Sequence, residues 1–425
     1  MLADQGYRSL FMQAATEQFE GRRGLVANFG FDDFIALEQM DTDGYQVANY
    51  FGVEDDIMLG YSKEWLKEQS DAPTLNTYLT ITPHHDYRAP DTYGRFDFHE
   101  HDVFNRYLNS VRYVDHFVEN VIDQYRELGL YDSTLFVIVG DHGEAFGEHG
   151  REQHDNVPWQ EGLHIPLMIH DPSGSIEAHR ISDPVSQIDI VPTIYDILGF
   201  DVVDADYPGY SGLSVDPQRL VYFSCWYDEQ CAGYLYEGDK YIHHYGNRRD
   251  QLFDVIEDPR EQSNLIDDYG APADELAAPF FLWRSAVDSA YEMHAREVIQ
   301  PRVLATTPQL ANPVGDTVDD AIEVIGYEWS DPDGDGFPSL RVGLRVLRHF
   351  KMLEDARFVL EGEDGVIADR QAMLGVFPPL IWQQGQFLLD ELPNVWFEKS
   401  GADDVTISLI VGSDRVELAE YPPEP

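Results

Sequence analysis

The residues best suited to chemistry are Asp141 and His142, which follow the apolar run 135–139 and Gly140. Together they offer a divalent cation one hard carboxylate oxygen and one imidazole nitrogen. Gly143 lets the backbone turn sharply away behind them. Asp-His-Gly also arises by chance, as a capping aspartate beside a surface histidine. The pair taken alone therefore marks only a candidate half of a metal site.

Short apolar strands alternate with helices over residues 1–290, a pattern typical of an α/β domain. The run 135–139 is short and rich in β-branched residues, which predicts a buried parallel strand. Asp141 and His142 then lie at its carboxyl end, the edge at which open α/β sheets bind ligands. Apolar residues recur at helical spacing over 101–128, so we predict a long amphipathic helix before this strand.

The rest of this first region is also expected to mix strands and helices. We predict strands at 165–170 and 221–224, a helix at 188–198, and a hairpin over 234–242 whose turn is 237–239.

Residues 301–313 contain three prolines and no hydrophobic period, which predicts a linker. Beyond it, alternating apolar segments separated by Gly, Pro and Asp turns predict an all-β sandwich. We therefore divide the chain into an α/β domain at 1–290, a helix end and linker at 291–318, and a β-sandwich at 319–425.

The charge balance is extreme, because 78 acidic and 28 basic residues give a formal net charge of −50 over 425 residues. Such a chain is not expected to bind nucleic acid. Self-repulsion destabilises a compact protein, and salt screens it over roughly 10 Å at 0.1 M and about 3 Å at 1 M. We predict a salt-adapted protein, the alternative being an acidic protein from an ordinary habitat. No apolar stretch approaches the ~18 residues of a membrane span.

Cys225 and Cys231 are the two cysteines of the chain. Two cysteines cannot form a disulfide framework or a four-ligand zinc site. A single bridge and a pair of free thiols are both compatible with their positions, so the sequence does not fix the redox compartment.

Four ordered motifs make the first region resemble the sulfatase branch of the alkaline phosphatase superfamily. They are the run 140–150 with His154 and the segment 163–169, the helix start at 185–194, the hairpin at 240–242, and the turn-containing segment 251–265. The resemblance implies an alkaline phosphatase/sulfatase-like sandwich with a mainly parallel central sheet, followed by the all-β domain.

The resemblance also implies a metal-dependent reaction. In this family a metal-bound Ser or Thr hydroxyl, or a formylglycine hydrate made from Cys or Ser, attacks the sulfur or phosphorus of an ester. Asp141 and His142 match the second pair of ligands to one divalent metal ion. His142 stands where calcium-dependent sulfatases commonly carry Asn, which favours manganese or zinc and leaves calcium open.

Four further residues are assigned to the substrate by resemblance, one of them as an alternative. His84 matches a histidine that donates a hydrogen bond to a transferred oxygen or protonates the leaving group, with His85 as the alternative by one position. His154 stands where many sulfatases carry a lysine that contacts the sulfate. Arg22 matches an arginine that lipoteichoic acid synthase-like phosphoglycerol transferases present to phosphate. The simpler alternative for each histidine is a surface imidazole.

Three functions are left open. The first is hydrolysis of a sulfate ester on a small molecule or glycan; the second is phosphoglycerol or phosphoethanolamine transfer, or phosphodiester cleavage; the third is non-catalytic binding. The sequence contains no Cys-x-Pro-x-Arg or Ser-x-Pro-x-Arg motif. The family's nucleophile lies before the segment that residues 6–11 resemble, so we expect an N-terminally truncated protein. We expect no esterase activity and weak metal binding from this chain alone.

Two features of the β-domain receive structural interpretations. Residues 331–336 copy the first half of an EF-hand loop, but its twelfth position is Val342 rather than Glu, so we predict an acidic turn. Trp382 and Trp396 are compatible with sugar binding, yet we expect them to be core aromatics.

Overall fold

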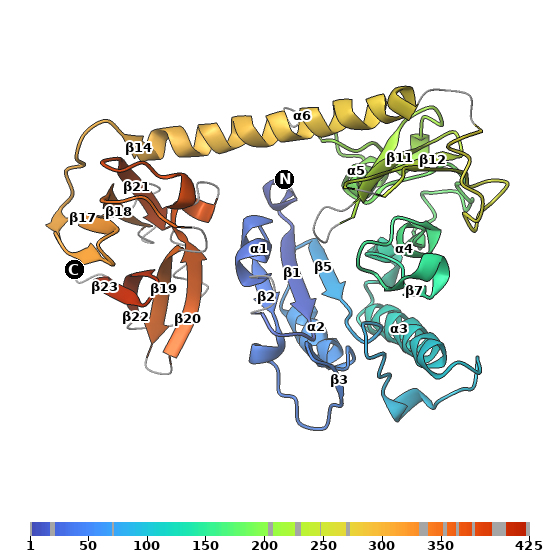
Figure 1. The fold of residues 1–425 in the computed structure, drawn as a ribbon. Coiled ribbons are helices and arrows are strands. Elements are labelled where there is room, and N and C mark those ends of the chain that lie inside the picture. The colour runs from blue at the N-terminus through green and yellow to red at the C-terminus, as the bar shows by residue number, and fades with distance from the viewer. Residues whose placement is uncertain are drawn as a thin grey trace. The chain divides into compact units, whose positions relative to one another are not determined.

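A computed structural model provides the structure (Figure 1). It describes residues 2–17, 22–69, 72–202, 207–225, 231–246, 248–268, 273–330, 339–351, 355–362, 365–375, 379–392 and 405–421. The chain divides into two compact units, residues 1–282 and 283–425, and each is described by itself. None of the helices in the described ranges is both long enough and apolar enough to span a membrane.

The first unit begins with a three-stranded parallel sheet in the order β2-β1-β5. Its strands are β1 (Arg8–Gln13), β2 (Asp33–Ile35) and β5 (Thr74–Leu79), drawn in blue in Figure 1. Helices α1 (Arg22–Asn28) and α2 (Ile57–Glu68) and the small hairpin of β3 (Val47–Asn49) and β4 (Gly52–Val53) complete this part. Leu10 and Met12 of β1 are fully buried against Ile57 and Met58 of α2.

The predicted long helix is confirmed as α3 (Asp102–Glu127). Phe117 and Val121 pack into the same core as β1 and α2, as their spacing indicates. The buried face also carries Asn105 and Asn109, whose side chains bond the backbone of Phe96 and Phe98. The helix therefore anchors the preceding loop as well as the core.

The strand before Asp141 is present as β6 (Phe136–Val139), but its predicted parallel pairing is wrong. It pairs antiparallel with β9 (Leu167–His170), with Val137 opposite Ile169. A parallel neighbour needs a crossover of a dozen or more residues, usually a helix. The connection here contains the short hairpin of β7 (Ala145–Phe146) and β8 (Glu152–Gln153), a 3-10 turn at Glu148–Gly150 and the one-turn helix α4 (Gln160–Leu163). Its residues, all of them described, include no long crossover helix, and the chain returns alongside β6 in reverse.

The expectation of a mainly parallel sheet therefore holds only for β1, β2 and β5 among the described strands. The later part of the unit is a four-stranded antiparallel sheet in the order β10-β11-β12-β13. Its strands are β10 (Val221–Ser224), β11 (Cys231–Tyr236), β12 (Asp239–His244) and β13 (Gln251–Asp254), and helix α5 (Ile190–Leu198) precedes them.

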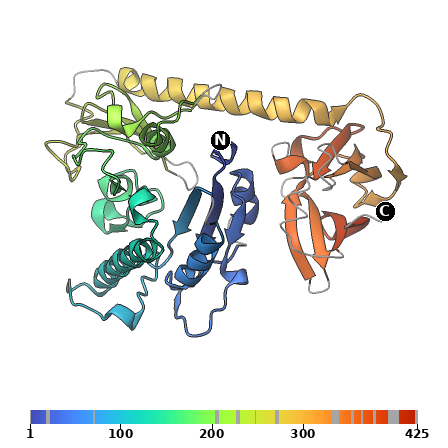
Figure 2. The ribbon, with the colours of Figure 1, turned by 180° about the vertical axis from the view of Figure 1, so that it is seen from behind.

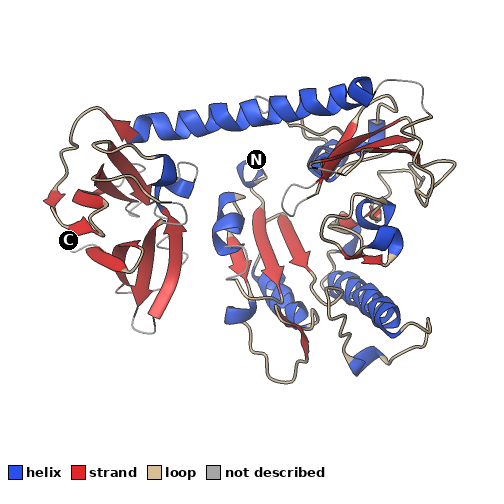
Figure 3. Ribbon diagram, in the orientation of Figure 1, coloured by secondary structure: helices blue, strands red, loops and turns tan. Residues whose placement is uncertain are grey.

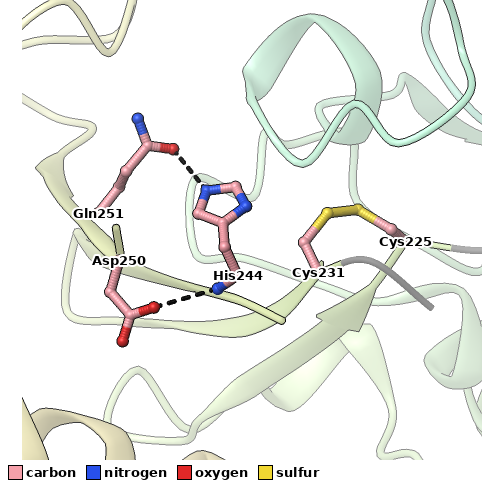
Figure 4. The surroundings of a disulfide bond; sticks show 5 residues. All are labelled: Cys225, Cys231, His244, Asp250 and Gln251. Atoms are coloured by element: carbon pink, nitrogen blue, oxygen red, sulfur yellow. Dashed lines mark hydrogen bonds between the residues drawn. A yellow bond between two sulfur atoms is a disulfide. The ribbon is translucent and has the colours of Figure 1, made fainter. Parts of the chain in front are cut away.

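The predicted hairpin is confirmed, with a turn of two residues rather than three. Glu237 and Gly238 both have positive φ, at 49° and 96°, and Asp239 already pairs with Tyr236. This is the backbone twist that favours two-residue hairpin loops. Cys225 and Cys231 form a disulfide near the opposite end of the hairpin, close to His244 (Figure 4). The bridge that the sequence left open is thus formed.

The second unit consists of two antiparallel sheets that share one core. Figures 2 and 3 show its strands. The larger sheet has the order β14-β21-β18-β17-β15, with β16 beside β17, and the smaller has the order β20-β19-β22-β23. The strands are β14 (Val303–Leu304), β15 (Asn312–Pro313), β16 (Thr317–Val318), β17 (Ile322–Ser330), β18 (Ser339–Val346), β19 (Ala356–Gly362), β20 (Gly365–Gln371), β21 (Phe387–Leu392), β22 (Val405–Val411) and β23 (Asp414–Tyr421).

The region that connects the two units contains a long helix and two short strands. Helix α6 (Ala273–Ile299) contains the division between the two units. The predicted linker 301–313 contributes β14 and β15, whose lengths of two residues each are too short to show a hydrophobic period. Trp382 is 1% exposed and lies in the core, as expected. Trp396 and the acidic turn at 331–336 lie outside the described residues.

Candidate metal site and histidine cluster

Asp141 and His142 follow β6 with their ligand atoms close together. The His142 Nδ1 lies 2.8 Å from the carbonyl oxygen of Gly143. A carbonyl oxygen only accepts, so Nδ1 carries the proton and Nε2 keeps its lone pair. That Nε2 lies 3.5 Å from the Asp141 Oδ2, and two ligands about 2.1 Å from one tetrahedral ion are about 3.4 Å apart. The two side chains therefore fit one divalent ion.

The loop that presents this pair is fixed by a close approach of another segment. The Gly143 N–H donates to the Gly162 carbonyl at 2.8 Å, and a Cβ on Gly143 would lie 2.0 Å from the Glu161 carbonyl oxygen. The Gln187 amide also donates to the Asp141 carbonyl at 2.6 Å. Glycine is thus required at 143 because α4 packs directly against it, a reason that differs from the turn expected from the sequence.

The four histidines singled out in the sequence converge on one place. The ring centroids of His142 and His154 are 4.1 Å apart, and those of His84 and His154 are 5.2 Å apart. His85 lies against His84 with a centroid separation of 4.1 Å. His84 and His85 follow β5, whereas His142 follows β6 and His154 follows β8. The fold therefore assembles one cluster from three separate loops.

His154 is paired with a carboxylate to which the sequence had given no role. Its Nδ1 lies 3.2 Å from the Glu144 Oε2, and the two side chains are only 10% and 5% exposed. Burial alone disfavours the imidazolium, but the hydrogen bond and charge of Glu144 outweigh it and raise the pKa of His154. Glu144 also bonds the buried Tyr87 hydroxyl, whose pKa is raised, chiefly by burial. His154 therefore has a built-in counter-charge.

His84 has the opposite electrostatic setting. Its Nδ1 lies 3.1 Å from the His85 carbonyl oxygen, which leaves Nε2 with the lone pair. Burial lowers the pKa of His84, and the His85 and His154 imidazoles lower it further. His84 is therefore a neutral acceptor near pH 7, beside a His154 that is easier to protonate.

A buried aspartate positions the loop that carries His84. The Asp55 carboxylate is 0% exposed and accepts from the backbone N–H groups of Ile81 and Thr82 at 2.8 and 3.1 Å. Burial, only partly offset by these bonds, raises the pKa of Asp55 to about 6. Sequence reasoning had not found this residue.

His85 and Arg22 are the two remaining residues predicted to contact the substrate. His85 Nε2 lies 3.2 Å from the Tyr50 hydroxyl. Arg22 is the first residue of α1, an element that carries none of the four histidines. The substrate roles of His85 and Arg22 both stay predictions.

A buried ion pair between Lys240 and Glu261 supports helix α4 and the neighbouring His149. Lys240 Nζ lies 2.8 Å from the Glu261 Oε1, with side chains 3% and 0% exposed. The other Glu261 oxygen accepts from the Gln160 N–H at the start of α4 at 2.6 Å. His149 stacks on Trp159 and places its Nε2 3.1 Å from the Glu261 carbonyl oxygen. The antiparallel sheet thus holds α4, which in turn holds Gly143.

The sulfatase family model matches residues 1–200, which include all four histidines and Asp141. Residues 1–200 belong to the sulfatase family. This places the segment in the alkaline phosphatase superfamily, a superfamily of enzymes.

Relatives of the sulfatase-family segment include both transferases and sulfatases by name. The chain is 28% identical over 218 residues to the lipoteichoic acid synthase-like YvgJ of Bacillus subtilis, covering 47% of this chain and 34% of that protein. It is 27% identical over 173 residues to an arylsulfatase of Clostridium perfringens, covering 38% and 35%. The chain therefore spans about a third of the length of the curated relatives it matches.

The solved structure of the lipoteichoic acid synthase LtaP from Listeria monocytogenes has the same fold. The TM-score is 0.51 at 18% identity, covering 60% of this chain and 64% of that one. At this identity the likeness establishes an alkaline phosphatase/sulfatase-like fold.

Proposed function

We propose that the sulfatase-family segment acts on sulfate esters of a small molecule or glycan, with one divalent ion held by Asp141 and His142. The observation that supports this most directly is the convergence of His84 and His154 on that pair. An ion bound there would withdraw charge from the ester oxygens. Manganese and zinc suit a carboxylate-imidazole pair best, and calcium is a weaker fit because it prefers oxygen ligands.

The two flanking histidines take different roles in this proposal. Protonated His154 keeps Nδ1–H on Glu144 and presents Nε2–H to an ester oxygen, so it is suited to donate a proton or a hydrogen bond. Neutral His84 presents the lone pair of Nε2 and is suited to accept a proton. The leaving-group role that the sequence suggested for His84 is therefore better given to His154.

Local charge favours a substrate with one negative charge. The positive charge of His154 is partly cancelled by Glu144, and the lowered pKa of His84 keeps that imidazole neutral. A sulfate ester carries one negative charge, whereas a phosphate monoester carries about 1.5 to 2 at pH 7. Apart from the proposed divalent ion, the two histidines add little fixed positive charge, which suits the singly charged ester.

A phosphodiester is the second candidate because it is also singly charged. The similarity to the lipoteichoic acid synthase-like YvgJ favours it, as does the resemblance of Arg22 to an arginine that transferases of that kind present to phosphate. A binding protein without catalysis is the third candidate.

Titration calorimetry of the chain in molar KCl with Mn²⁺ tests the proposal. The ligands are 4-nitrophenyl sulfate, 4-nitrophenyl phosphate and bis(4-nitrophenyl) phosphate, and nitrophenolate release is read in the same samples. We expect the sulfate ester to bind at least tenfold more tightly than the monophosphate, and Asp141→Asn to remove this binding. The exposed Asp132→Asn is the charge-matched control and should bind like the unmodified chain.

Two results would overturn the sulfate assignment. Tighter binding of the diester than of the sulfate ester would favour the phosphodiester class. Absence of any Mn²⁺-dependent ester binding would favour the non-catalytic candidate. Turnover by the chain alone would contradict the separate expectation that this chain is inactive.

A further inference from the structure

His84, His85 and His154 form a second group of metal-ligating side chains that uses neither Asp141 nor His142. One ring nitrogen from each lies within 4.8 Å of the others, and no other group of three His, Cys, Asp or Glu in the described residues meets this spacing. Two imidazole nitrogens on one tetrahedral zinc ion are about 3.4 Å apart. A closure of about 1.4 Å, within reach of small ring rotations, brings all three onto one ion.

Hydrogen bonds already fix two of the rings for metal binding. The Glu144 carboxylate can only accept, so the His154 Nδ1 donates to it and Nε2 keeps its lone pair. This carboxylate-histidine arrangement is the usual support of a metal-bound imidazole. The His84 Nδ1 donates to the His85 carbonyl at 3.1 Å, which likewise leaves Nε2 available.

His85 supplies an independent sign of a missing ligand. Its Nδ1 is buried and has no hydrogen-bond partner among the described residues, although buried polar atoms are nearly always satisfied. Its Nε2 lies 3.2 Å from the Tyr50 hydroxyl. When Nε2 donates to that oxygen, Nδ1 keeps the lone pair that a metal ion needs.

We propose that His84, His85 and His154 form a three-imidazole site for a transition-metal ion such as Zn²⁺, with its fourth position open. Nitrogen ligands favour zinc, copper, nickel and cobalt over the oxygen-seeking Mg²⁺ and Ca²⁺. The site uses neither Asp141 nor His142, and its ligands are inferred without reference to the proposed ester chemistry. Its occupation would engage both histidines that the ester requires, so Zn²⁺ at this site would exclude the ester.

Zinc titration of the chelator-treated chain against a chromophoric zinc indicator in molar KCl tests the site, with Co²⁺ absorption as a second readout. The weak metal binding expected from the sequence concerns the Asp141-His142 pair; at the three-histidine site we expect one tight ion per chain and intense visible Co²⁺ bands of a tetrahedral site. His85→Gln should weaken Zn²⁺ binding at least 100-fold and remove these bands. Glu144→Gln should weaken it 10- to 100-fold, as loss of a supporting carboxylate does elsewhere.

Two variants separate this site from its neighbour and from the acidic surface. Asp141→Asn should leave the tight zinc site unchanged, and His179→Gln, at an exposed histidine, should do the same. Circular dichroism confirms that each variant is folded. Zinc binding that survives His85→Gln, or that disappears in Asp141→Asn, would overturn the proposal, as would binding no tighter than that of a His85→Gln/His154→Gln double variant.

Discussion

Replacing Lys240 with methionine removes the positive partner of a carboxylate that has no access to water. Lys240 Nζ lies 2.8 Å from the Glu261 Oε1, and burial lowers the pKa of Lys240 even beside that charge. Breaking a buried pair from one side typically costs about 3 to 5 kcal/mol. Methionine retains most of the buried chain, and Glu261 keeps its bond from the Gln160 N–H. We therefore expect a loss of about 3 kcal/mol in the free energy of unfolding of the first unit.

The measurement is urea unfolding in molar KCl at pH 7, followed by tryptophan fluorescence, to which Trp159 in the same network contributes. A Lys240→Met/Glu261→Gln variant should regain more than half of the loss, because glutamine is neutral and still accepts from Gln160. Lys63→Met is the matched control. Lys63 pairs with Glu127 at 2.6 Å on the surface, so its loss should cost about 0 to 1 kcal/mol.

A Lys240→Met loss below about 1 kcal/mol, no larger than that of an exposed pair, would show that the charges are not coupled. A double variant less stable than Lys240→Met would show that the Glu261 charge is not what the single variant leaves uncompensated.

Three further perturbations follow from the site and the charge balance. Gly143→Ala should destabilise the first unit by more than about 2 kcal/mol in urea unfolding and weaken Mn²⁺ binding, because its Cβ would meet the α4 backbone at 2.0 Å. Gly140→Ala is the control, since the nearest contact of its Cβ is at 3.4 Å, and it should cost under about 1 kcal/mol. Asp55 has a folded-state pKa of about 6 against 3.8 unfolded, so it binds more protons when folded, and its contribution falls by about 2 kcal/mol as the pH rises from 4 to 7. Unfolding of Asp55→Asn across that range should lack this fall, and parallel curves for the two proteins would contradict it. The melting temperature of the chain should rise from low to molar KCl, because salt screens a formal charge of −50, and an unchanged melting temperature would exclude salt adaptation.

Elements with a strong local pattern could be predicted from the sequence. α3 and the β11-β12 hairpin were found because helical spacing and a Glu-Gly turn are local properties. The pairing direction of β6 was not found, because it depends on the route of the chain over the next 27 residues, between Val139 and Leu167. Both strands were recognised, but their antiparallel pairing was not.

In the candidate site, too, some residues could be predicted from the sequence and others could not. Asp141 and the histidines stand out because their residue types are uncommon and their order matches a family motif. Glu144, Asp55 and Glu261 do not stand out, since each is one of 78 acidic residues and differs from the rest only in being buried against a particular partner. Burial, and pairing with partners 10 to 101 positions away, are properties of the fold, so these supporting carboxylates became visible only in the structure.

The scarcity of lysine gives the buried Lys240 a use as a reporter. The chain has five lysines in 425 residues, and the side chains of Lys63 and Lys67 are 37% and 48% exposed. An amine-reactive reagent can therefore modify these surface amines at once, but it reaches Lys240 only when the sheet around it opens. The ratio of the two labelling rates measures the free energy of that opening in the native protein. Lys240 therefore reports on local opening of the antiparallel sheet that supports α4.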